Sequence, residues 1–136
     1  MMPNVPVLEG VLVRLEHLSS NHAADLAAAA EENRGTYGFS WVPTAAQVDD
    51  YLRDQFDRVR AGSMVALAQI RREDGRAVGC TAFWNPRTWP ENSYLCAVEI
   101  GFTWLGASAQ GTGINTESKL LWWSTHSTSG TLNELI

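Results

Sequence analysis

The chain has 136 residues, of which 45% are hydrophobic and 18% are charged, and its formal net charge is −5. This composition suits a single globular domain with a modest core and excludes a disordered chain. The acidic balance gives no general attraction for nucleic acid or for an anionic membrane surface, so we expect neither as a partner. The histidines and cysteines show no metal-ligand spacing, so we expect no metal.

Targeting signals are not visible in the sequence. The N-terminal segment lacks the basic region and the long apolar stretch of a secretory signal, and no window reaches the ~18 apolar residues of a membrane span. Cys80 and Cys96 both lie in apolar, strand-like runs and are expected as buried, reduced thiols. We therefore expect a cytoplasmic protein.

The first half of the chain predicts a strand followed by two helices. Residues 11–15 are typical of a short strand, and Ser20 is expected to cap an alanine-rich helix over residues 23–33. An aromatic loop follows at residues 37–43. A capping-box pattern at Thr44 and Gln47 then precedes a second helix. The charged side of that helix is expected to be solvated surface.

The second half predicts strands and one more helix. Residues 64–70 and 76–84 are strand-like, and Asp74-Gly75 between them is a strong hairpin signal. The run 96–105 alternates as a strand. It is expected to place Cys96, Val98, Ile100, Phe102 and Trp104 on one face and Ala97, Glu99, Gly101 and Thr103 on the other. With no repeat or linker in between, residues 1–136 are expected to form one α/β domain, a mixed but mostly antiparallel sheet with helices on both faces.

The run from Ser108 to Glu117 is the most informative stretch, because it joins the last predicted strand to the last predicted helix. Glycines at 111 and 113 can turn several backbone N–H groups in one direction, and the helix adds its free N–H groups and its dipole. Together they predict a site for a phosphate or a pyrophosphate. A P-loop would need lysine after the second glycine, where Ile114 stands, and a dinucleotide fingerprint would need glycine at Thr116.

Residues 110–115 resemble the Gln/Arg-x-x-Gly-x-Gly/Ala loop of the Gcn5-related N-acetyltransferase (GNAT) superfamily. They match it at Gln110 and Gly113 and depart from it at Asn115. The upstream organisation is similar to the ribosomal-protein and small-molecule acetyltransferase branch of that superfamily. This likeness covers residues 8–121 and includes Leu8–Leu15, Ala77-Val78-Gly79, Glu99–Trp104 and Asn115-Thr116-Glu117.

The resemblance implies acetyl-CoA as co-substrate and an amine as acceptor, either a protein N-terminus or a small molecule. It implies that the strand bulges and splays at Phe102, Thr103 and Trp104, and that the backbone of these residues contacts the pantetheine arm. It further implies that the pyrophosphate is held by Gln110, Gly111, Thr112, Gly113 and Asn115.

Glu99 is the candidate base, with a pKa expected to be raised by partial burial; the alternative is a surface or salt-bridged glutamate. Tyr94 is a candidate proton donor or simply a loop or core aromatic. Two aromatic loops are candidate walls of the acceptor pocket, and simple packing is the alternative for each ring. The rings concerned are Tyr37, Phe39, Trp41, Trp84 and Trp89.

The family pattern stops after about residue 121, and residues 122–136 are expected as a divergent tail, polar over residues 124–131. This suggests a truncated acetyltransferase that lacks the C-terminal strands of the fold. Such a chain is expected to expose Trp122 and Trp123 in part, and to aggregate or to form a homodimer through its open sheet edge. Two other functions stay open: a CoA- or phosphate-binding module without turnover, and an interaction module that pairs through its edge strand.

Overall fold

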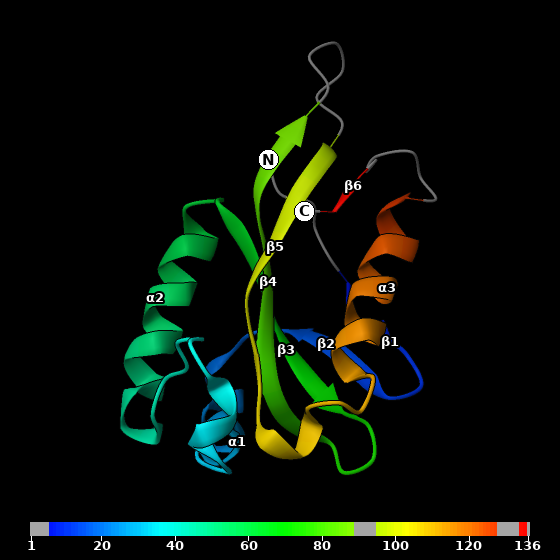
Figure 1. The fold of residues 1–136 in the computed structure, drawn as a ribbon. Helices are drawn as coiled ribbons and strands as arrows, with labels where there is room; N and C mark the ends of the chain where they lie inside the picture. The colour runs from blue at the N-terminus through cyan, green and yellow to red at the C-terminus, as the bar shows by residue number, and fades with distance from the viewer. Residues whose placement is uncertain (1–5, 89–94, 128–133, 136) are drawn as a thin grey trace.

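The computed structural model describes residues 6–88, 95–127 and 134–135, with a six-stranded sheet in the order β1-β2-β3-β4-β5-β6 (Figure 1). Strands β1 to β5 form an antiparallel meander, and β6 pairs with β5 in parallel. The strands are β1 Leu8–Glu9, β2 Val13–His17, β3 Met64–Arg71, β4 Arg76–Thr88, β5 Leu95–Leu105 and β6 Glu134–Leu135. The helices are α1 Ala23–Ala30, α2 Val48–Arg60 and α3 Ile114–Ser127.

Helices cover both faces of the sheet, so the predicted α/β class is confirmed. Helices α1 and α2 lie on one face and α3 lies on the other (Figure 1). The first layer buries a cluster that includes Leu26, Leu52 and Trp104. The second layer buries a cluster built around Phe83 and Trp122. Because the two clusters lie on opposite faces, each strand residue is assigned to a face by the cluster that it joins.

The sequence signals around α2 are confirmed. Thr44 and Gln47 form the predicted capping box, in which the Thr44 amide donates to the Gln47 side chain at 2.9 Å. A 3-10 turn at Ala45–Gln47 leads into α2. The helix ends before Gly62, whose φ of +76° suits a residue without a Cβ atom. The Asp74-Gly75 turn also joins β3 to β4 as predicted.

The N-terminal elements differ from the prediction in three respects. The expected strand over residues 11–15 lies at Val13–His17 as β2, and Leu8–Glu9 form a separate strand β1, because Gly10 turns the chain and its amide bonds to the Val13 carbonyl. Ser20 does not cap α1: it begins a 3-10 turn whose N-cap is Ser19, and α1 starts at Ala23 after His22. The first helix ends at Ala30 instead of Asn33, because the Asn33 side chain caps a separate 3-10 helix, Arg34–Tyr37.

The expectation for the end of the chain was wrong for Trp122, whereas Trp123 is partly exposed as expected. Helix α3 continues through Ser127, so the predicted polar tail is helical at its start. Trp122 is completely buried, and its ring stacks on that of Phe83 with 3.7 Å between centroids. The packing of Trp122 against the sheet keeps the end of α3 helical, although the sequence after Leu121 lacks a regular pattern of apolar residues.

Candidate functional site

The turn before α3 presents free backbone amides. Gly111 and Gly113 adopt φ values of +72° and +91°, a region open to glycine and strained for other residues. The last residues before the turn are bonded locally, as the Ala109 and Gln110 amides donate to Gly106 and Ala107. Within the described part of the chain, no residue accepts the amides of residues 111–116. The first intrahelical bond of α3 runs from Glu117 to Gly113. A helix N-terminus with free amides and a positive dipole end is suited to an anion.

The side chains of this loop stabilise the loop itself. The Gln110 amide donates to the Leu105 carbonyl at 3.0 Å and to the Thr36 hydroxyl at 2.9 Å. The Thr112 hydroxyl donates to the Ala109 carbonyl. Asn115 is half-buried, and its buried Oδ1 has no partner among the described residues. The loop therefore offers backbone amides, and not the Gln110 side chain, to a ligand.

Strand β5 carries a bulge at Phe102 and Thr103. The pairs Cys80–Trp104 and Ala82–Gly101 leave one β4 residue opposite these two β5 residues. Phe102 has a φ of +52°, and no other non-glycine residue in the described part of the chain has a positive φ. A bulge leaves backbone groups outside the ladder and re-aims side chains. A positive φ is uncommon at a bulky residue, and residues strained in this way cluster at functional sites.

The bulge overturns the predicted alternation of β5. Ile100 packs in the α3 layer, whereas Trp104 packs in the α1–α2 layer, so they lie on opposite faces. Thr103 turns toward α3 and its hydroxyl bonds to that of Thr81 at 2.8 Å. The extra residue at the bulge reverses the faces to which the following residues of β5 point. A bulge cannot be recognised from the alternation of apolar and polar residues alone.

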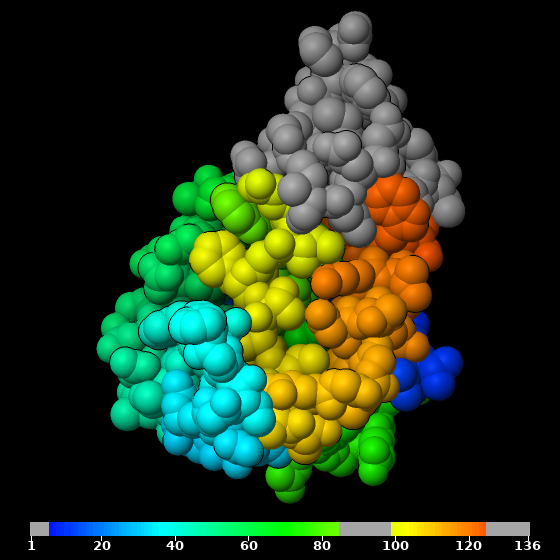
Figure 2. Space-filling model, in the orientation of Figure 1, coloured from blue at the N-terminus to red at the C-terminus, as the bar shows by residue number. Residues whose placement is uncertain are grey.

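The outer edge of β5 is open next to the bulge. Strand β6 pairs with β5 only at Ala97 and Val98, and no strand of the described residues pairs with the outer edge from Glu99 to Leu105. Figure 2 shows the surface hollowed between the yellow atoms of β5 and the orange atoms of α3. An extended ligand can therefore lie along β5 and reach the N-terminus of α3.

A second depression lies on the other face, between α2, the loop before α2 and the bulge. Its volume is about 680 Å³, within the range of small-molecule sites. Trp41 and Ser40 line it from the loop, and Phe102, Thr103 and Trp104 line it from β5. The 3-10 turn before α2 contributes Gln47, and α2 contributes Asp50, Tyr51, Asp54, Gln55 and Arg58. We call this depression the aromatic cleft.

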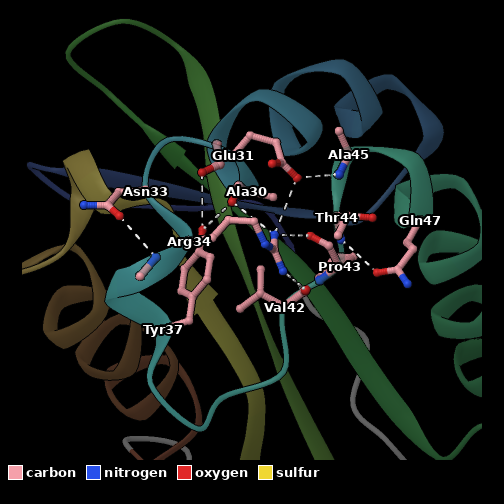
Figure 3. A network of polar contacts seen from close by, with 12 residues as sticks. Ala30, Glu31, Asn33, Arg34, Tyr37, Val42, Pro43, Thr44, Ala45 and Gln47 are labelled. Carbon is pink, nitrogen blue, oxygen red and sulfur yellow. Dashed lines mark hydrogen bonds and ion pairs between the residues drawn. The ribbon is translucent and has the colours of Figure 1, made fainter.

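The loop that forms one wall of the aromatic cleft is closed by Arg34 (Figure 3). Its guanidinium donates to the carbonyls of Ala30, Val42 and Pro43, at 3.2, 2.7 and 3.1 Å. The Tyr37 hydroxyl donates to the last carbonyls of α1, and burial raises the pKa of this phenol. These bonds fix the ends of the loop, while Trp41, which directly precedes Val42, stays exposed.

Tyr51 lines the aromatic cleft, and Cys80, which stands opposite Trp104 in the β4–β5 register, is buried in the same core cluster. The Trp104 indole N–H donates to the Tyr51 hydroxyl at 3.4 Å. Burial raises the pKa of Tyr51 far above its usual range and the pKa of Cys80 to about 12. Cys80 is therefore the buried, protonated thiol that the sequence predicts, and it is no nucleophile at neutral pH.

The candidate base lies beside the bulge. Glu99 is half-buried and stands opposite Trp84 in the β4–β5 register, and directly opposed residues share a face. Trp84 packs against the α1–α2 layer, which places Glu99 on the same face as the aromatic cleft. Tyr94 and Trp89 lie outside the described residues.

Sequence reasoning missed the role of α2 in the aromatic cleft. Asp50, Asp54 and Arg58 are exposed, as expected for solvated surface, yet all three line the cleft. Arg58 bonds to Asp54 at 3.2 Å and lies 5.1 Å from the centre of the Phe102 ring. The i,i+4 spacing of Asp54 and Arg58 predicts their ion pair, but only the fold brings Phe102 to it.

Comparison with known proteins identifies the family. A family model described as an acetyltransferase (GNAT) domain matches residues 13–135. The chain therefore belongs to the GNAT acetyltransferase family, as its residues 110–115 predict. No curated protein sequence matches the chain significantly.

Three solved structures illustrate the shared fold. A GCN5-related N-acetyltransferase from Brucella melitensis has a TM-score of 0.66 at 28% identity, over 90% of this chain and 54% of that one. The Salmonella typhimurium acetyltransferase that modifies the N-terminal serine of ribosomal protein L7/L12 has a TM-score of 0.69 at 16% identity, over 93% and 71%. The microcin C7 self-immunity acetyltransferase MccE, solved with acetyl-CoA and AMP, has a TM-score of 0.71 at 17% identity, over 90% and 67%.

This chain spans about half of the length of the Brucella protein. In the parts of the chain that the structure describes, no helix is long and apolar enough to cross a membrane. Within the same residues, no group of three or more His, Cys, Asp or Glu side chains is arranged to hold a metal ion.

Proposed function

We propose that this chain binds acetyl-CoA and transfers its acetyl group to an amine, either of a protein N-terminus or of a small molecule. The observation that carries the proposal is the set of unbonded amides of residues 111–116 at the start of α3. They lie at the end of the strand whose bulge and open edge can receive the rest of the cofactor.

The pyrophosphate is assigned to the turn before α3. The amides of Gly111, Thr112 and Gly113 and those of the first turn of α3 would donate to its oxygens. Asn115 contributes its backbone there, because the end of its side chain is buried. The Gln110 side chain supports the loop from behind through Leu105 and Thr36.

The pantetheine arm is assigned to the open edge of β5, along Phe102, Thr103 and Trp104. Amide groups of an extended arm can pair with the unpaired backbone of such an edge. The thioester would then lie at the bulge, where the backbone of Phe102 leaves the β4–β5 ladder and can donate to the carbonyl oxygen.

The reaction then needs a proton acceptor and an amine placed against the thioester carbonyl. The amine nitrogen attacks the thioester carbonyl carbon, a C–N bond forms, the C–S bond breaks, and CoA leaves as a thiolate that takes up a proton. We assign the proton released by the amine to Glu99, directly or through a water molecule. The amine would approach from the aromatic cleft, which opens on the face that Glu99 shares.

Two neighbours support acetyl transfer to an amine. One solved relative carries acetyl-CoA and AMP, and another modifies the N-terminal serine of a ribosomal protein. The chain spans only part of each of these proteins. We therefore propose, for this chain, the acetyltransferase activity, the amine acceptor and a cytoplasmic location.

Calorimetry with acetyl-CoA and with CoA, followed by a thiol-release assay against a panel of amines, tests the proposal. We expect both cofactors to bind and at least one amine to release thiol. Binding without thiol release from any amine would leave a CoA-binding module and overturn the enzymatic part. Absence of binding would overturn the whole proposal and favour the edge-strand interaction module.

A further inference from the structure

We propose that the aromatic cleft selects a primary amine joined to a flat aromatic group. The inference rests on the proposed acetyl transfer and names the acceptor class for it. It is carried by two large rings that line one cleft and remain open to solvent, Trp41 with 66% and Phe102 with 41% of their surface exposed. Exposed aromatic rings gathered at a depression are typical of a binding surface.

Both rings are held in place before any ligand arrives. Trp41 lies against Tyr51, with 6.0 Å between ring centroids, in the loop that Arg34 closes. Phe102 lies against Trp84 at 5.7 Å and below the Arg58 guanidinium at 5.1 Å. Rigid rings lose little conformational entropy on binding, so their contact with a flat ligand contributes most of its energy to affinity.

Both carboxylates of the cleft are paired with arginines. Asp50 bonds to Arg53 at 3.0 Å and Asp54 bonds to Arg58 at 3.2 Å, so the lining carries no excess of negative charge. Only the net charge of the whole chain, −5, favours the approach of an ammonium group. The amine part of the inference therefore comes from the proposed acetyl transfer, and the aromatic part comes from the two rings.

The size and lining of the cleft disfavour a small aliphatic amine. A volume of about 680 Å³ exceeds what a short alkyl chain fills. An alkyl chain would also leave the exposed surface of the Trp41 ring, and the part of the Phe102 ring that Arg58 does not cover, in contact with water. A flat ring can stack on them and gain about 0.5–1.5 kcal/mol beyond the area that it buries.

The test compares 2-phenylethylamine with 2-cyclohexylethylamine, two primary amines of similar size of which only the first is flat. Calorimetry without acetyl-CoA measures their binding, so the result does not depend on turnover. We expect phenylethylamine to bind about three- to tenfold more tightly, and its kcat/KM to be higher by a similar factor if acetyl transfer occurs. Equal binding of the two amines, or binding of neither, would overturn the inference.

Three variants show whether Trp41 carries the preference. Trp41→Ala is expected to abolish the preference for the flat amine, and Trp41→Phe is expected to keep most of it. Phe39→Ala is the matched control, because Phe39 is a fully exposed ring of the same loop that does not line the cleft. If Phe39→Ala removes the preference as fully as Trp41→Ala, or if Trp41→Ala keeps it, the inference is wrong. CoA binding by each variant is measured in parallel, so a failure of the proposed cofactor site is recognised separately.

Discussion

The side chain of Gln110 bonds to the hydroxyl of Thr36 at 2.9 Å, although 74 positions separate them in the chain. Gln110 stands in the loop assigned to the pyrophosphate, and Thr36 stands in the segment that leads to the aromatic cleft. The same amide also holds the Leu105 carbonyl at the end of β5. One side chain therefore links the proposed cofactor loop, the bulged strand and the loop of the proposed acceptor site.

Removal of this link from either side is expected to lower the free energy of unfolding. A net hydrogen bond contributes about 1 kcal/mol. Thr36→Val removes the bond from Gln110 and the bond from the Thr36 hydroxyl to the Asn33 carbonyl, and Gln110→Ala also removes two bonds, so each should cost about 2 kcal/mol. Urea unfolding measures both values. Thr36→Ser keeps the hydroxyl and serves as the control; a Thr36→Val variant as stable as Thr36→Ser would contradict the link.

Glu117 is expected to fix the β1–β2 turn to α3. Its carboxylate accepts the amides of Val11, Leu12 and Val13, at 3.1, 2.8 and 2.9 Å. A Cβ atom on Gly10 would overlap with the same carboxylate. Glu117→Gln and Gly10→Ala should each lower the free energy of unfolding by about 2 kcal/mol, because bonds to a charged acceptor are strong.

These two substitutions should not be additive, because they damage the same contact. The double variant is expected to be only slightly less stable than either single variant in urea unfolding. Glu73→Gln, an exposed glutamate at the β3–β4 hairpin, is the control and should have little effect. Full additivity in the double variant would show that Gly10 and Glu117 act separately.

Acid should weaken the fold through Glu16. The hydrogen bond from His22 is the main cause that lowers the pKa of Glu16 below its ordinary value of about 4.5, with Arg14 adding to it against the effect of burial. A pKa lowered in the folded state means that folding favours the ionised carboxylate. The stabilisation is therefore complete above about pH 4.5 and is lost as the pH falls through the lower folded pKa.

Glu16→Gln should remove this part of the pH dependence. We expect the wild-type chain to be more stable than the variant in urea at pH 6 and the difference to shrink toward pH 3. Asp74, whose pKa is lowered by Arg71, remains in both proteins and cancels in the comparison. A stability difference that stays constant from pH 6 to pH 3 would refute the role of Glu16.

Local signals were sufficient for most of the elements. The Thr44–Gln47 capping box, the Asp74-Gly75 turn and the glycine turn before α3 act within a few residues, so the sequence predicts them directly. The bulge at Phe102 is implied by the family resemblance but by no local signal, because a phenylalanine with positive φ carries none. Its conformation depends on contacts with Trp84 and Arg58 that only the assembled fold provides.

The candidate site also combines features that local sequence predicts with features that depend on the assembled fold. The free amides at residues 111–113 follow from the glycine spacing, and Trp41 was a candidate from its aromatic loop. The closure of that loop by Arg34 and the contribution of α2 to the aromatic cleft depend on contacts between distant segments. A helix face rich in aspartate and arginine gives no sign of which of its charges faces a cleft.

The most direct test of the account is the calorimetric affinity for CoA of Gly113→Val, beside a control at Gly62. Both glycines have positive φ, +91° and +76°, so valine strains the backbone at each, but only Gly113 lies in the proposed pyrophosphate turn, with Leu12 nearby. The account predicts that Gly113→Val weakens CoA binding by tenfold or more while Gly62→Val binds CoA as the wild type does. Wild-type affinity in Gly113→Val, or an equal loss in both variants, would contradict it.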